Sequence, residues 1–357
     1  MRLLIAGGGT GGHLYPGVAV AEELLSRVGD HAVHFAGTDR GLEARVLPTL
    51  GMPFTAVRAA GVVGTGLRGM LRAAWTLVLG SGDALGLLRR FRPQACLGVG
   101  GYVSFPVVAL ARLRGVPVAV QEQNASPGLT NRLLSKLAKR VYAGDPAALG
   151  HLPAAKTRLT GNPLRRSLRE PLPYRAPGAG ETLHLLVVGG SQGAASLNRA
   201  VPAALDGLVA PVSVRHQAGR GNGEIVAERY GGRKGVEVEE FIDDMHAAYR
   251  WAHLVVSRAG ALSIAELQAA GRPAVLVPFP FAAGNHQEAN ARAAAGLGAA
   301  VYLLDTGLEQ GALSEMLEKL VGTPGRLDEM AAAAAAAARR DAARDIVDDL
   351  LALGGEG

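Results

Sequence analysis

The chain alternates short apolar runs with longer segments in which apolar residues recur every three or four positions. In the first half, four apolar runs predict β-strands, at 3–6, 32–36, 95–99 and 116–120. The segment 18–28, by contrast, has the helical period. Short apolar runs separated by helical segments are typical of a parallel sheet that is covered by helices on both faces. The first half of the chain is therefore predicted to be an α/β domain.

The same order of elements restarts in the second half. The run 183–188 leads into another glycine turn, and further strands are predicted at 254–257 and 274–278. Between the two halves, residues 165–182 are rich in Arg and Pro and have little periodicity, which is typical of a linker. Two repeats of one strand–turn–helix order predict two similar domains.

We therefore expect an α/β protein of two Rossmann-like domains, with parallel sheets that face each other across a cleft. The length of 357 residues suits two domains of ordinary size. The first domain is predicted at 1–163 and the second at 164–334. The tail, residues 330–353, is rich in alanine and strongly helix-prone. We expect a C-terminal helix, at about 335–357, to pack back on the first domain.

Composition narrows the class of partner. With 48% hydrophobic and 19% charged residues, the chain can bury a large core. A net charge of +6 favours anionic partners, among them nucleotides, nucleic acid and acidic membranes. The single cysteine, Cys96, fits a reducing compartment. The N-terminal apolar run is too short for a signal peptide, and no apolar run reaches the length of a transmembrane helix. We expect a cytoplasmic protein.

The first glycine turn and the residue after it are candidates for chemistry. Residues 7–12 contain the pattern G-x-G-x-x-G, in which backbone amides can approach a phosphate at a helix N-terminus. A dinucleotide-binding protein would close its second strand with an acid, but here that strand ends at Thr38 and Asp39 follows late. An NAD enzyme is therefore disfavoured. His13 directly follows the turn, where a neutral imidazole is either a general base or a structural residue.

The second half offers a matching set of donors. Residues 189–194 form a second candidate anion site, to which Ser191 adds a hydroxyl. Glu266 falls about one and a half turns into a predicted helix, placed for the two hydroxyls of a ribose. The alternative is a solvated helix glutamate. The sequence has no Asp-x-Asp triplet, so we expect no metal, and an anionic leaving group would be stabilised by amides, helix dipoles and a cation such as Arg165.

Nine segments of the chain are similar to one protein family. They are GGTGGH at 8–13, GGYVSFP at 100–106, QEQN at 121–124, PGLTN at 127–131, GNPLR at 161–165, GGSQGA at 189–194, FIDDM at 241–245, RAGALSIAE at 258–266 and NHQEANA at 285–291. In this order they resemble the bacterial MurG glycosyltransferases of peptidoglycan synthesis. Each segment alone is a weak signal, but nine in order across nearly the whole chain are very specific.

The resemblance implies a GT-B fold, with the acceptor domain first and the UDP-GlcNAc domain second. It implies inverting transfer of GlcNAc from UDP-GlcNAc to the C4 hydroxyl of MurNAc in lipid I, the undecaprenyl-linked acceptor. The product would be lipid II, and no cofactor is implied. One departure from the family pattern is Gly284, where many relatives carry an acid.

The resemblance also implies roles for individual residues. His13 and Glu122 are the positions near the acceptor hydroxyl, and either could be the base. The positions that would bind the donor are Thr10, Gly11, Gly12, Asn124, Arg165, Ser191, Ile242, Ala261, Leu262, Glu266 and Gln287. Among them, Ile242 would meet the uracil, Glu266 the ribose, and Ser191 and Arg165 the diphosphate.

A polyprenyl-linked acceptor requires contact with a membrane surface. Residues 62–92 combine apolar side chains with interleaved arginines, which suits shallow burial among anionic headgroups. Within this segment, the residues expected to contact lipid are Met70, Leu71, Trp75 and Leu79. The alternative is an ordinary core helix with a solvated basic edge. We expect a peripheral protein at the cytoplasmic face of the cell membrane, with other cell-wall synthesis proteins as partners and no nucleic acid.

Three other functions deserve comparison. A GT-B enzyme with another lipid acceptor is disfavoured by segments 100–106 and 121–131, which belong to the acceptor half and match the MurG pattern. A UDP-GlcNAc epimerase shares the two-domain frame but would need acid–base side chains at C2 of the sugar, and no matching set is present. A non-catalytic nucleotide-sugar-binding regulator is the third alternative.

Overall fold

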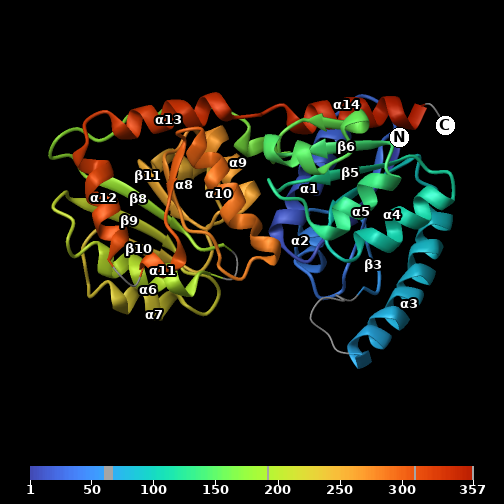
Figure 1. Ribbon diagram of the computed structural model, residues 1–357, viewed down its shortest axis with the longest axis horizontal. Helices are drawn as coiled ribbons and strands as arrows, with labels where there is room; N and C mark the ends of the chain where they lie inside the picture. Colours follow the sequence, from blue (N-terminus) through green and yellow to red (C-terminus); the bar gives the residue numbers. More distant parts are fainter. Residues whose placement is uncertain (60–66, 191–192, 309–310, 356–357) are drawn as a thin grey trace. The chain divides into compact units, whose positions relative to one another are not determined.

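The computed structural model of the chain divides into two compact units (Figure 1). Unit 1 comprises Met1–Arg166 and Arg340–Gly357, and unit 2 comprises Ser167–Arg339. The structure describes residues 1–59, 67–190, 193–308 and 311–355, with only the backbone described for 67–74 and 283. The chain passes between the units close to a short 3₁₀ turn, η3 (Arg166–Leu168), inside the predicted linker.

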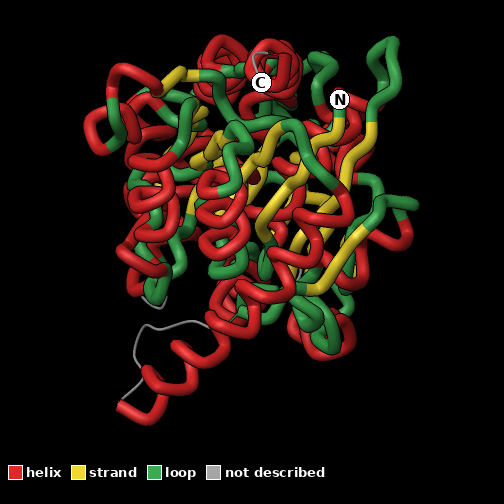
Figure 2. The backbone as a smooth tube through the Cα atoms, turned by 90° about the vertical axis from the view of Figure 1, so that its right-hand side faces the viewer, coloured by secondary structure: helices red, strands yellow, loops and turns green. Residues whose placement is uncertain are grey.

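Unit 1 contains a seven-stranded parallel sheet in the order β3-β2-β1-β4-β5-β6-β7. Strands are drawn in yellow and helices in red in Figure 2. The strands are β1 (Arg2–Gly7), β2 (Ala32–Gly37), β3 (Phe54–Ala56), β4 (Ala95–Gly100), β5 (Val118–Glu122), β6 (Arg140–Ala143) and β7 (Thr157–Leu159). Every residue of β4 and β5 is buried, as expected for strands that are covered on both faces. The strand order reverses between β1 and β4, so the turns that follow these two strands meet at the carboxyl edge.

The helices of unit 1 cover the two faces of this sheet. They are α1 (Gly11–Leu25), α2 (Glu43–Thr49), α3 (Leu67–Phe91), α4 (Ser104–Leu113), α5 (Leu129–Leu137) and α14 (Ala342–Gly355), with 3₁₀ turns η1 (Pro146–His151) and η2 (Ala154–Lys156). Helix α1 begins at Gly11, earlier than the predicted start at residue 18, and contains Pro16. Helix formation therefore starts directly at the glycine turn, despite a proline that cannot donate to the helical ladder.

Helix α14, the C-terminal helix, belongs to unit 1 and packs against α1. Its residues Ile346, Val347 and Leu350 are buried in the same cluster as the side chains of β1. On the polar side, the largely buried Asp349 accepts a hydrogen bond from Tyr142 Oη (2.9 Å) and pairs with the Arg140 guanidinium (3.2 Å). A buried carboxylate that is paired in this way holds the last helix on the sheet of unit 1.

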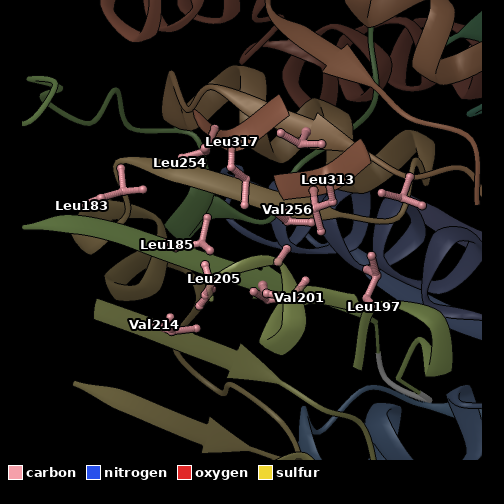
Figure 3. Packing of buried hydrophobic residues seen from close by; sticks show 14 of the residues in the cluster. Leu183, Leu185, Leu197, Val201, Leu205, Val214, Leu254, Val256, Leu313 and Leu317 are labelled. Atoms are coloured by element: carbon pink, nitrogen blue, oxygen red, sulfur yellow. The ribbon is translucent and has the colours of Figure 1, made fainter. Parts of the chain in front are cut away.

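Unit 2 contains a six-stranded parallel sheet in the order β10-β9-β8-β11-β12-β13. The strands are β8 (Leu183–Val188), β9 (Val212–Gln217), β10 (Val236–Glu239), β11 (Leu254–Ser257), β12 (Ala274–Leu276) and β13 (Ala300–Tyr302). The helices are α6 (Ala195–Ala204), α7 (Gly223–Arg229), α8 (Met245–Trp251), α9 (Ala261–Ala270), α10 (His286–Gly296), α11 (Asp305–Leu308), α12 (Ala312–Gly322) and α13 (Arg326–Ala337), with 3₁₀ turn η4 (Ala283–Asn285). Figure 3 shows part of the core, in which α6 and α12 pack on the apolar side chains of β8, β9 and β11. The predicted α/β class with parallel sheets is confirmed.

Two of the differences between the predicted and the observed strand bounds bear on the site. Strand β5 begins two residues later than the apolar run suggested and continues through the polar pair Gln121 and Glu122, which are buried. Strand β12 ends at Leu276, two residues before Pro278, which cannot donate to a ladder. Polar side chains in a buried strand are unusual and need hydrogen-bond partners. The partners of Gln121 and Glu122 therefore determine how the loops at this edge of unit 1 are held.

A fully buried histidine makes the stability of unit 2 depend on pH. His216 Nδ1 lies 2.7 Å from Tyr230 Oη, and its Nε2 lies 3.0 Å from Asn198 Oδ1. Burial lowers the pKa of His216 to about 4. Between pH 6.5 and about 4, the unfolded chain therefore binds a proton that the folded chain does not, so stability is lost as pH falls through this window.

We expect this histidine alone to cost roughly 2 kcal/mol of stability between pH 7 and pH 5. Thermal unfolding of the wild type and of His216→Gln at both pH values checks the expectation. The variant should lose less stability on acidification than the wild type. Equal losses in the two proteins would show that His216 does not carry the effect.

Candidate functional site

The turns that follow β1 and β4 interlock at the carboxyl edge of unit 1. The amide of Gly8 donates to the carbonyl of Gly100 (3.4 Å), and a Cβ on Gly101 would lie 2.6 Å from Gly8 O. Ser104, at the start of α4, accepts the Gly100 amide at 3.1 Å and lies 2.6 Å from the Ala6 carbonyl. The glycines are therefore required for two turns to approach this closely, and a buried hydroxyl holds them together.

His13 lies in the first turn of α1, where its ring packs on the second glycine turn. A Cβ on Gly100 would lie 2.7 Å from His13 Nδ1, and Gly100 has φ +101°, which favours glycine. The Nδ1 atom is shielded from solvent, whereas the residue as a whole is partly exposed. Because Nδ1 is shielded, a contact between His13 and a substrate hydroxyl would have to be made by Nε2.

Glu122, the other candidate base, ends β5 and is only 1% exposed. Its Oε1 accepts hydrogen bonds from the amide (2.9 Å) and the side chain (3.0 Å) of Asn124. Its Oε2 accepts from the amide of Gly128 (3.2 Å) and from Asn131 Nδ2 (2.9 Å). Four donors occupy a buried carboxylate, which is thereby suited to organising the following loop. The geometry favours His13 over Glu122 as the base.

Further amide side chains hold the ends of β4 and β5 together. Gln121 Nε2 donates to Asn162 Oδ1 (2.9 Å), and Asn162 Nδ2 donates to the carbonyl of Gln123 (3.0 Å). Gln123 Nε2 donates in turn to the carbonyl of Val99 (2.7 Å). All of these side chains are buried. The segment around Glu122 is therefore a rigid polar scaffold, in which Asn124 is tied to that carboxylate.

Arg165 and the first turn of α1 bring a cation next to backbone donors. The guanidinium of Arg165 lies 4.6 Å from the centre of the Tyr15 ring, and Tyr15 is on α1 beside Gly11. Thr10 is the N-cap residue of α1, and its side chain makes no capping hydrogen bond. Together with the partly exposed Gly11 and the exposed Gly12, it presents polar groups at the helix N-terminus. Such an arrangement can bind an anion. Arg165 lies in unit 1, although the predicted boundary assigned it to the second domain.

The predicted donor residues of unit 2 that the structure describes lie at the carboxyl edge of its sheet. Ala261 and Leu262 open α9, directly after β11, and Glu266 follows in the second turn. The carboxylate of Glu266 accepts a hydrogen bond from Tyr249 Oη of α8 (3.0 Å). Glu266 is thus not a simply solvated helix residue, because a buried tyrosine orients it. Tyr249 was not predicted from the sequence.

The remaining predicted donor positions of unit 2 are Ile242, Gln287 and Ser191. Ile242 is buried in the loop between β10 and α8. Gln287 lies in the first turn of α10, and its Oε1 accepts the amide of Phe279 (2.9 Å), which fixes the loop after β12. Gly284, the departure from the expected family pattern, has φ +62°, a conformation that favours glycine. Ser191 lies outside the described residues.

Arg258 is a further residue that sequence reasoning left without a role. Its guanidinium donates to Ser196 Oγ (2.7 Å) and to the carbonyl of Val277 (3.2 Å), and it pairs with Asp305. These partners come from the start of α6, the end of β12 and the start of α11. Arg258 therefore joins three loops at the carboxyl edge of the unit 2 sheet. The sequence feature that could have indicated this role is an arginine directly after a buried strand.

Two family models match the chain, one in each half. Residues 3–143 match the glycosyltransferase family 28 N-terminal domain, and residues 184–346 match the C-terminal domain of that family. The crystal structure of Acinetobacter baumannii MurG superposes with a TM-score of 0.80 at 32% identity, covering 98% of this chain and 99% of that one. The fold thus defines a glycosyltransferase of the GT-B class.

A curated relative from Alkalilimnicola ehrlichii is 47% identical over 351 residues, which is 97% of each chain. Its name is UDP-N-acetylglucosamine--N-acetylmuramyl-(pentapeptide) pyrophosphoryl-undecaprenol N-acetylglucosamine transferase. The chain belongs to the MurG family within glycosyltransferase family 28. A UDP-GlcNAc 2-epimerase from Neisseria meningitidis also superposes, with a TM-score of 0.65 and coverage of 98% of this chain and all of that one, but at 13% identity this likeness is one of fold alone.

Proposed function

We propose that this chain transfers GlcNAc from UDP-GlcNAc to the C4 hydroxyl of MurNAc in lipid I, with inversion at the anomeric carbon, and so forms lipid II. The observation that carries the proposal is full-length similarity, at 47% identity, to a transferase named for this reaction. Unit 1 would bind the acceptor and unit 2 the donor.

In the proposed reaction, His13 acts on the acceptor hydroxyl. The C4 oxygen of MurNAc forms a bond to C1 of GlcNAc on the face opposite UDP, while the bond between C1 and the diphosphate oxygen breaks. The proton of the C4 hydroxyl moves to His13, and UDP leaves with the electron pair. A single displacement of this kind converts the α-linked donor into a β-linked product. Helix-start amides and Arg165 would stabilise the charge that develops on UDP.

A coupled assay of UDP release tests the proposal. The protein would be given UDP-GlcNAc with and without a lipid I analogue, and each reaction would be repeated with EDTA. We expect release that requires the acceptor and survives the chelator. Release without acceptor, or formation of UDP-ManNAc, would instead favour hydrolysis or an epimerase. Loss of activity with EDTA that Mg²⁺ restores would contradict metal independence.

Glu266 gives a prediction for donor binding. Replacing it by alanine should weaken UDP binding about ten- to a hundredfold, because charge-assisted hydrogen bonds contribute about 1.5–3 kcal/mol. Tyr249→Phe should have a smaller effect in the same direction, since it removes only the hydroxyl that orients Glu266. Titration calorimetry with UDP measures both, with the exposed Glu315→Ala on α12 as the control. Unchanged affinity in Glu266→Ala would remove Glu266 from the donor site.

We further propose that unit 1 binds the membrane through one apolar surface on α3, α4 and α5. Helix α3 packs on α4, and α4 packs on α5, so the three helices lie side by side (Figure 1). The exposed apolar residues of these three helices, as far as their side chains are described, are Trp75, Leu77, Val78, Leu113, Leu129, Leu133 and Leu137. Basic residues accompany them on all three helices, including Arg89, Arg112 and Lys136. Apolar side chains with interleaved cations suit an anionic bilayer surface.

The lipid contacts expected from the sequence need one adjustment. Trp75 is 64% exposed and Val78 is 61% exposed, whereas Leu79 is half-buried. Met70 and Leu71 lie in α3, but their side chains are outside the described part of the structure. None of the helices in the described part of the chain has the length and apolar character that crossing a membrane requires. Peripheral attachment at the cytoplasmic face is our proposal, and partners among other cell-wall synthesis proteins stay a prediction.

A double variant, Trp75→Ala with Val78→Glu, should lower sedimentation with phosphatidylglycerol vesicles several-fold and leave UDP affinity unchanged. The variant loses the aromatic area of Trp75 that would be buried in the bilayer. It also places a negative charge next to the negatively charged lipid headgroups. The matched control is Leu50→Ala with Val28→Glu, which alters exposed apolar residues of unit 1 on other elements. Equal sedimentation of the double variant and the control would contradict this membrane surface.

A further inference from the structure

A buried carboxylate lies against the glycine turn that leads to His13. Glu43 is the first residue of α2 and is 0% exposed. Its Oε2 accepts the amide of Gly9 (2.8 Å), and its Oε1 accepts the amide (2.7 Å) and the hydroxyl (2.9 Å) of Thr38. One side chain thus connects the turn after β1 with the end of β2.

Three glycines provide the space that this carboxylate occupies. A Cβ on Gly8, Gly37 or Gly41 would overlap atoms of the Glu43 side chain. Larger residues at these positions would displace it. The glycine turn after β1 is therefore shaped around a carboxylate of the protein itself, in addition to any substrate.

Burying a carboxylate against neutral donors is costly compared with burying an apolar side chain of similar size. The cost is offset here by three hydrogen bonds to the carboxylate, two of them from backbone amides. Gly9 has φ +94°, a backbone conformation that favours glycine. Glu43 fixes the amide of Gly9 and with it the conformation of the turn.

We propose that Glu43 is a positioning residue for the transfer reaction, because it sets the turn from which His13 projects. From Gly9 the chain passes to the N-cap residue Thr10, whose carbonyl accepts the amide of His13 at 3.2 Å. On the other side, Gly100 packs on the His13 ring. The histidine is held between an anchored turn and a glycine contact. This inference rests on the proposed function, in which His13 takes the acceptor proton.

Steady-state kinetics of Glu43→Gln test the proposal. The variant keeps the size of the side chain but replaces one carboxylate oxygen by an NH₂ group. This group would face the amide of Gly9 or of Thr38, which is itself a donor, so one hydrogen bond would be lost. We expect kcat to fall about a hundredfold, since a displacement of about 1 Å at a catalytic group has that effect. KM for UDP-GlcNAc should change much less than kcat, because the donor-binding residues of unit 2 are untouched. Unchanged kcat in a folded Glu43→Gln protein would overturn the proposal.

A second variant allows chemical rescue. Glu43→Ala leaves a space lined by glycines and by the amides of Gly9 and Thr38, in which formate can accept the same hydrogen bonds. Added formate should raise kcat of Glu43→Ala and leave the wild type unaffected. The matched control is Glu23→Gln, which removes an ion pair with Arg27 at the other end of α1. If Glu23→Gln lowered kcat as strongly as Glu43→Gln, a general effect on α1 would replace the proposed one.

Histidine NMR separates this inference from the proposed function, because it needs no turnover. In Glu43→Gln, the ring resonance of His13 should shift while that of the buried His216 stays in place. A wild-type protein without transferase activity would refute the proposed function and leave this result standing. An unmoved His13 resonance, with activity intact in the wild type, would refute only the positioning role.

Discussion

Replacing His13 by alanine lowers kcat about 10²- to 10⁴-fold, the range that general-base catalysis contributes. The affinity for UDP-GlcNAc changes by less than about twofold, because the imidazole of His13, on α1 of unit 1, is expected to act on the acceptor hydroxyl and not to bind the donor. Kinetics with a lipid I analogue and calorimetry with UDP measure the two quantities separately. The loss should appear in kcat at saturating acceptor, since the imidazole acts on the hydroxyl after binding.

The control for this variant is His151→Ala, which removes an exposed histidine from η1 of the same unit. It should retain wild-type kcat. Full activity of His13→Ala would exclude His13 as the base. A loss of donor affinity equal to the loss of kcat/KM would instead make His13 a binding residue.

Replacing Glu122 by glutamine destabilises unit 1 by about 2–4 kcal/mol, the largest stability effect that we expect. The glutamine NH₂ group would face donors that now point at a carboxylate oxygen, among them Asn131 Nδ2. Leaving one buried donor unsatisfied costs about 1–3 kcal/mol. More than one of the donors to Glu122 would lose its acceptor in the variant. Activity should fall in parallel, because the loop after β5 loses its anchor.

Thermal unfolding and kinetics together decide the role of Glu122. The exposed Asp39→Asn in the same unit is the control, with no expected change in stability. A Glu122→Gln variant of wild-type stability whose kcat is reduced more than a hundredfold would mean that Glu122 is the base. Reduced stability with residual activity would leave that role to His13.

Sequence patterns located the buried strands better than the helix ends. The strands β8 and β11 have the predicted bounds, because buried apolar runs in a parallel sheet end abruptly at turn residues. The start of α1 was missed, because Gly11, Gly12 and Pro16 all have low helix propensity. Tertiary packing of α1 on the sheet overrides that propensity.

In the alanine-rich tail, helix propensity predicts more helix than the structure contains. Helix propensity predicts one continuous segment, yet the structure has α13 in unit 2 and α14 in unit 1, separated at residues 338–341. Helix α13 packs on α9 and α14 packs on α1. The break is imposed by two different packing partners, which local propensity does not record.

The glycine turns and His13 were predictable, but the side chains that hold them were not. Ser104 bonds to the carbonyl of Ala6, and Glu43 bonds to the amide of Gly9. Arg258 joins loops that are distant in sequence. A contact between a side chain and a remote backbone atom has no local pattern, so such residues become visible only once the strand order is known.

The most direct test of the central claim is the structure of the product. The protein would be incubated with ¹³C-labelled UDP-GlcNAc and a lipid I analogue, and the purified product examined by NMR. The account predicts a single new β-linked GlcNAc, with its anomeric carbon coupled to the proton at C4 of MurNAc. An α linkage, attachment at another hydroxyl, or label recovered only as free GlcNAc or ManNAc would contradict it.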